Sequence, residues 1–120
     1  MVNNNCVVIV EPDDLIRGLL ERWLGEAGYR AIIVAGNDEL PRVKPRLVIA
    51  DISAPGTAGN TIGALRATYA APILALSARF RRGLGASREP AQRLHVDKLL
   101  PKPFTRAQLL RAVREILHDV

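Results

Sequence analysis

The chain has 120 residues, enough for one domain with a sizeable core and too few for two. Hydrophobic residues make up 48% and charged residues 24%, and no apolar run approaches the roughly 20 residues that span a bilayer. The net charge is +5, but only 4% of residues are aromatic and no stacking motif accompanies the arginines, so nucleic-acid binding by this domain alone is not expected. A single cysteine, Cys6, and an N-terminus unlike a signal peptide favour a cytoplasmic protein.

The chain begins with a predicted strand and an amphipathic helix. Residues 7–10 form a continuous apolar run, typical of a strand that is buried on both faces of a parallel sheet. Asp13 or Asp14 can cap the helix that follows, because a short carboxylate accepts hydrogen bonds from the free N–H groups of a first turn. Apolar residues from 15 to 24 recur at helical spacing, and Gly28 supplies a C-terminal stop.

Two further strands are predicted in the middle of the chain. Residues 29–34 are rich in Ile and Val and predict the second strand. The segment after it can hold only a short helix, because Pro41 allows little beyond a first turn capped by Asn37. The third strand, residues 47–50, leads directly to Asp51. A carboxylate at that point would lie at the rim of the sheet, where open α/β folds bind their ligands.

A helix beginning at Asn60 or Thr61 precedes the fourth predicted strand, residues 72–76, which ends at Ser77. Two glycines and a proline interrupt any helix between residues 79 and 93, so an irregular segment is expected there.

The last predicted elements are a fifth strand, residues 96–100, and a helix in which Thr105 and Gln108 form a capping box. Five short apolar strands that alternate with helical segments predict a parallel sheet with helices on both faces. The chain is therefore expected to form a single α/β domain, residues 1–120.

Polar residues follow four of these strands in an ordered set. They are the acidic loop Glu11–Asp14, Asp51 with Pro55 and Gly59 behind it, Ser77, and Lys102 in the run Lys102-Pro103-Phe104. In their order and spacing these residues resemble the receiver domain of two-component response regulators, from about residue 5 to residue 118. The resemblance implies a flavodoxin-like, doubly wound sheet with strand order 2-1-3-4-5, and a cis peptide between Lys102 and Pro103.

The resemblance also implies the chemistry of the site, with Asp51 as the phosphoryl acceptor. A carboxylate can attack a phosphoryl group, and Lys102 and the Ser77 hydroxyl could neutralise or bind the phosphoryl oxygens. Enzymatic activity would then be at most self-catalysed phosphoryl transfer to Asp51 and hydrolysis from it, with a histidine kinase or phosphotransfer protein as donor. Magnesium suits such a site, and the implied ligands are Glu11, Asp13, Asp51 and the backbone carbonyl of Ser53.

The chain departs from the family pattern at two positions of the site. Pro12 replaces a carboxylate that normally touches the metal, and proline offers only a backbone carbonyl. Either Asp13 swings in, or Glu11 reaches with its extra methylene, or metal binding is weakened or lost. At the switch position, where the family usually has Tyr or Phe, stands Leu99, which cannot report through a hydroxyl.

The irregular segment and the fifth strand, from Arg79 to Leu100, form the expected partner face, which would contact an output domain, a partner protein or a second copy in a homodimer. Its arginines would complement acidic surfaces. They are Arg79, Arg81, Arg82, Arg88 and Arg93. The alternative to a phosphorylated receiver is a pseudo-receiver, a binding module of the same fold that acts without phosphorylation. A flavodoxin-like enzyme is less consistent with the sequence, which has no Gly-rich phosphate loop.

Overall fold

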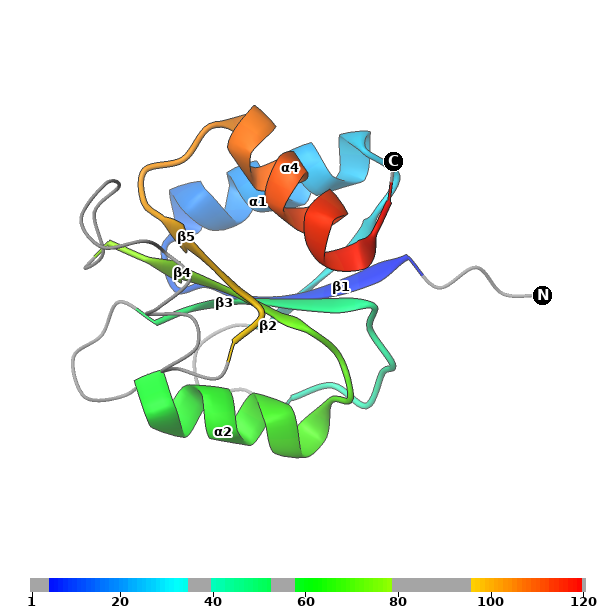
Figure 1. Ribbon diagram of the computed structural model, residues 1–120, viewed down its shortest axis with the longest axis vertical. Helices are drawn as coiled ribbons and strands as arrows, with labels where there is room; N and C mark the ends of the chain where they lie inside the picture. The colour runs from blue at the N-terminus through cyan, green and yellow to red at the C-terminus, as the bar shows by residue number, and fades with distance from the viewer. Residues whose placement is uncertain (1–4, 35–39, 53–57, 79–95, 120) are drawn as a thin grey trace.

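The computed structural model describes residues 5–34, 40–52, 58–78 and 96–119 (Figure 1). The elements in chain order are β1 (Cys6–Val10), α1 (Asp14–Glu26), β2 (Arg30–Val34), β3 (Leu47–Asp51), α2 (Ala58–Thr68), β4 (Ile73–Ser77), β5 (Lys98–Pro101) and α4 (Arg106–Leu117). All four strand pairings are parallel, and the strand order is β2-β1-β3-β4-β5. The flavodoxin-like order expected from the sequence is confirmed.

The sheet is the middle of three layers, with α1 and α4 on one face and α2 on the other (Figure 1). Alternate residues of each strand point to opposite faces, so Val7 and Ile9 pack with α1 and α4 whereas Val8 packs with α2. All three side chains are fully buried, which explains why β1 reads as a continuous apolar run. No helix in the described part of the chain is long and apolar enough to cross a membrane.

Local signals in the sequence set the helix ends. The Asp13 side chain caps α1, and Gly28 follows that helix with a φ of +93°, a left-handed conformation that favours glycine. Thr105 and Gln108 form the predicted capping box of α4. The peptide bond between Lys102 and Pro103 is cis, as the resemblance implied.

The first four strands differ by one residue at one or both ends from the sequence-based expectation, and three other elements differ as well. The fifth strand begins at Lys98 rather than at residue 96, and the preceding Asp97 carboxylate accepts a hydrogen bond from the Ile73 amide at 2.8 Å. α2 begins at Ala58, before the predicted start. In the predicted short helix, residues 40–43 are not helical, and residues 37–39 lie outside the described part.

A polar network connects the residues that precede β1, β2 and β3 to the end of α4. The Tyr29 hydroxyl donates to Asp119 Oδ2 at 2.6 Å, and the Arg46 guanidinium lies 3.0 Å from Asp119 Oδ1 and 2.9 Å from Asn5 Oδ1. Hydrogen bonds from Arg46 and then Tyr29 lower the pKa of Asp119. Burial and the Asp119 carboxylate raise the pKa of Tyr29. These residues lie at the end of the sheet opposite to the polar residues that follow the strands.

Candidate functional site

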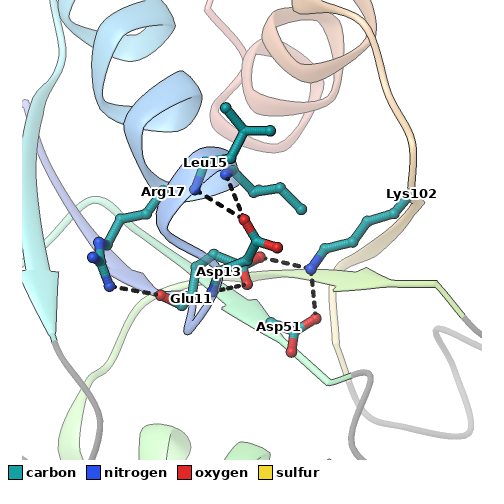
Figure 2. Close-up of polar contacts among 7 residues, drawn as sticks. Glu11, Asp13, Leu15, Arg17, Asp51 and Lys102 are labelled. Carbon is teal, nitrogen blue, oxygen red and sulfur yellow. Dashed lines mark hydrogen bonds and ion pairs between the residues drawn. The ribbon is translucent and has the colours of Figure 1, made fainter.

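The polar residues predicted to converge do meet at the carboxyl edge of the sheet. Glu11 follows β1, Asp51 ends β3, Ser77 ends β4, and Lys102 follows β5. Figure 2 shows the Lys102 side chain extending from its loop toward Glu11 and Asp51, which come from two other strands. The parallel sheet therefore brings together groups that lie far apart in the sequence.

Lys102 pairs with both carboxylates at once. Its Nζ atom lies 2.7 Å from Glu11 Oε1 and 2.9 Å from Asp51 Oδ1. The side chains are 12%, 1% and 9% exposed for Lys102, Glu11 and Asp51, so these ion pairs are shielded from water. Burial alone lowers the pKa of Lys102, but its close contacts with the Glu11 and then the Asp51 carboxylates, and the charges of both, outweigh burial and raise the pKa. The ammonium is therefore charged at neutral pH.

The loop between β1 and α1 holds Glu11 in place (Figure 2). The backbone amide of Asp13 donates to Glu11 Oε2 at 3.1 Å, and the Arg17 guanidinium donates to the Glu11 carbonyl at 3.4 Å. The Asp13 carboxylate points to the helix instead, where its Oδ1 atom accepts from the amides of Leu15 and Ile16 at 2.9 and 3.0 Å. The two acidic residues thus have separate tasks in this conformation.

Glu11 Oε1 is the most unusual atom of the site. It is buried, and among the described residues it accepts no hydrogen bond of regular geometry. Its contact with Lys102 is therefore mainly electrostatic. Together Glu11 and Asp51 carry two negative charges and Lys102 carries one positive charge, which leaves a net charge of about −1 in a shielded site. A small cation that prefers oxygen ligands, such as Mg²⁺, fits this donor set.

Few carboxylates at the site are available to bind a metal ion. Pro12 contributes none, and the described residues contain no cluster of three or more acidic, histidine or cysteine side chains arranged for a metal ion. Mg²⁺ commonly retains several waters and uses one or two carboxylates, so two are sufficient. Of the expected ligands, Ser53 lies outside the described residues.

Ser77 is fully buried at the end of β4, and its carbonyl accepts a hydrogen bond from the Lys102 amide at 3.0 Å. In the sheet register Asp51 is paired with Leu76, so Ser77 stands one residue beyond the aspartate. Leu99 is 3% exposed and belongs to the apolar core on the α2 side of the sheet. The arginines of the predicted partner face, from Arg79 to Arg93, lie outside the described residues.

An apolar groove that the sequence pattern does not predict adjoins the site. Its volume is about 640 Å³, and its floor is formed by α1 and by the loop after β5. Leu15 is 74% exposed at its rim, although helical spacing places that residue on the apolar stripe of α1. The lining residues are Glu11, Pro12, Asp13, Leu15, Ile16, Leu19, Asp51, Ala78, Lys102, Pro103 and Phe104. The exposed Leu15 and the Asp51 carboxylate therefore line the same groove.

Phe104 also joins the groove to the core beneath α1. Its ring meets that of Trp23 edge-on, with centroids 6.3 Å apart and planes at 68°. Because Phe104 is two residues from Lys102, the contact links the loop that carries the lysine to the carboxyl-terminal half of α1.

Comparison with known proteins identifies related chains. No family model matches the sequence. Protein PetR of Rhodobacter capsulatus is 35% identical over 123 residues, which cover 95% of this chain and 49% of PetR. The chain spans about half the length of the curated relatives it matches.

Solved structures extend the comparison to the whole described fold. A response regulator receiver protein from Burkholderia phymatum has a TM-score of 0.75 and 26% identity, with 96% of both chains covered. The receiver domain of the sensor histidine kinase PA1611 from Pseudomonas aeruginosa, which holds a magnesium ion in its active-site cleft, has a TM-score of 0.71 and 24% identity. That match covers 97% of this chain and 99% of the other.

Proposed function

Since the chain belongs to the receiver domains of two-component response regulators, we propose that it accepts a phosphoryl group on Asp51. The observation that carries this proposal is the position of Lys102, whose ammonium lies 2.9 Å from Asp51 Oδ1 at the end of an apolar groove. A partner can reach Asp51 through the groove, and a fixed positive charge stands where the charge of a phosphoryl group would develop.

The reaction requires little covalent assistance from the protein. An oxygen of the Asp51 carboxylate forms a bond to phosphorus while the P–N bond of a phosphohistidine breaks, and the imidazole leaves with the electron pair and takes up a proton. Lys102 shifts its contact toward the transferred phosphoryl oxygens, and the Ser77 hydroxyl donates to another of them. Hydrolysis follows the same geometry, with water attacking phosphorus and the bond to Asp51 breaking to release orthophosphate.

Mg²⁺ is the proposed cofactor. When bound, it would neutralise phosphoryl charge that Lys102 alone leaves unbalanced. Glu11 and Asp51 are the described residues that would hold it, and the Ser53 carbonyl is a further ligand that the family resemblance implies. Support comes from the buried Glu11 Oε1 atom, which lacks a regular hydrogen-bond donor, and from the magnesium ion in the cleft of the PA1611 receiver domain.

The proposed donor is a histidine kinase or a phosphotransfer protein. The groove beside Asp51 exposes Leu15 and is lined by Ile16, Leu19 and Phe104, so it suits the apolar face of a helix that carries the phosphohistidine. Output would pass to a domain or partner at the face from Arg79 to Leu100. The curated relatives are about twice as long as this chain, which is consistent with an output domain in those proteins.

Intact mass after incubation with acetyl phosphate, with and without Mg²⁺, tests the proposal. The expected result is a Mg²⁺-dependent gain of one phosphoryl group that Asp51→Asn abolishes. Asp14→Asn is the matched control, because this exposed carboxylate lies near the site and contacts Arg17 rather than Lys102. If the folded protein gains no phosphoryl group from acetyl phosphate or from its kinase, the proposal is wrong and the pseudo-receiver is the better interpretation.

A further inference from the structure

Pro12 stands where receiver domains usually have a metal-binding carboxylate, and the structure indicates which neighbour compensates. We propose that Glu11 takes over the metal-binding task of that missing carboxylate, whereas the Asp13 carboxylate serves only the helix cap. This assignment rests on the proposed function and decides between two acids that the sequence leaves equivalent.

The conformation of Glu11 is the first argument. Its Oε2 atom is anchored by the Asp13 amide at 3.1 Å, so its other oxygen is directed into the site and ends 2.7 Å from Lys102 Nζ. The same ammonium contacts Asp51, which places the Glu11 and Asp51 oxygens on a common cation. An aspartate is one methylene shorter, so Glu11→Asp could not keep both the amide contact and the approach to Asp51.

The contacts of Asp13 are the second argument. Its Oδ1 atom accepts two backbone hydrogen bonds from the first turn of α1, and its side chain is exposed. Turning this carboxylate toward Asp51 would leave both amides without their acceptor. A serine at position 13 could still cap the helix but could not bind Mg²⁺ as a carboxylate does. The two tasks can therefore be separated by substitution.

The third argument is electrostatic. Glu11 Oε1 is a buried carboxylate oxygen whose negative charge is met chiefly by an ammonium that it shares with Asp51. When Lys102 turns to a phosphoryl group on Asp51, Glu11 needs another cation, because an unpaired buried charge is strongly unfavourable. A divalent ion bound by Glu11 meets this need, and Asp13, being exposed, has no such requirement.

Calorimetric titration of the 120-residue protein with Mg²⁺ tests the assignment without relying on phosphorylation. We expect Glu11→Asp to weaken Mg²⁺ binding about 10-fold or more, as loss of a metal contact usually does. Adding Pro12→Asp to that variant recreates the usual acidic pair and should restore the affinity. Asp13→Ser should behave like its exposed neighbour Asp14→Ser, both remaining within about threefold of the unmodified protein because neither removes a ligand.

Each contrary result has a distinct meaning, provided that thermal melts show folded variants. The assignment would be overturned if Glu11→Asp bound Mg²⁺ with wild-type affinity. It would also be overturned if Asp13→Ser lost Mg²⁺ binding while Asp14→Ser kept it. Either result would leave the proposed function intact. Mg²⁺ binding that appears only with aspartate at position 12 would show that Glu11 does not compensate. If even Glu11→Asp/Pro12→Asp fails to bind Mg²⁺, both this assignment and the metal role in the proposed function are wrong.

Discussion

Lys102 is expected to stabilise the fold as well as to serve the site, and Lys102→Met tests this. The substitution keeps most of the side-chain volume but leaves Glu11 and Asp51, 1% and 9% exposed, without the ammonium between them. Removing one partner of such a buried pair costs about 3–5 kcal/mol. A domain of this size has a total stability of about 5–15 kcal/mol. The melting temperature should therefore fall by roughly 10 °C or more.

A second substitution at the site gives a further check. In an Asp51→Asn background the penalty of Lys102→Met should be smaller, because only one buried carboxylate then remains.

Urea unfolding at neutral pH measures these effects, and Lys98→Met is the matched control. Lys98 also pairs with a carboxylate at short range, 2.6 Å from Glu115, but both side chains are about two-fifths exposed. Solvent screening makes such surface pairs weak, so this control should destabilise the protein far less. Equal losses in Lys98→Met and Lys102→Met, or a penalty of Lys102→Met that is undiminished in the Asp51→Asn background, would refute the reasoning.

Three further predictions concern the rest of the fold. Asp119→Asn should lower the pKa of Tyr29 toward its usual value, because the side chain that accepts the hydrogen bond from the Tyr29 hydroxyl then carries no charge. Ultraviolet titration of the tyrosines would detect this change, and an unchanged titration curve would contradict it. Thr105→Ala removes the acceptor of the Gln108 amide and should cost about 1 kcal/mol in chemical unfolding, whereas no change would mean that the capping box is not stabilising. Leu24→Ala should cost about 2–5 kcal/mol by the same assay, because the leucine is fully buried between α1 and the sheet; a loss below that range would indicate that the core closes around the cavity.

The architecture could be predicted from the sequence because its signals are local and repeated. The three central strands are mainly apolar runs with no polar face, and residues such as Asp13 and Thr105 cap helices through contacts that span only two or three positions. The meeting of Asp51 and Lys102 followed from the parallel sheet, which places the ends of β3 and β5 at one edge.

Other features depend on tertiary geometry that spacing does not encode. Helical periodicity places Leu15 on the apolar stripe, but it lies in the first turn of α1, beyond the sheet, and is exposed there. The choice between Glu11 and Asp13 as the buried acid depends on the backbone path of the loop that contains Pro12. The residue before β5 is held by a hydrogen bond from the Ile73 amide to the Asp97 carboxylate, which joins residues 24 positions apart.

The edge-on contact between Trp23 and Phe104 has a practical consequence. The chain contains one tryptophan, so its fluorescence comes from a single known place on α1. Phe104 follows Lys102 by two residues, and any shift of that loop alters the surroundings of the indole. The protein therefore carries a built-in optical reporter of the Lys102 loop, and rapid-mixing fluorescence can follow movements of that loop in the unlabelled protein.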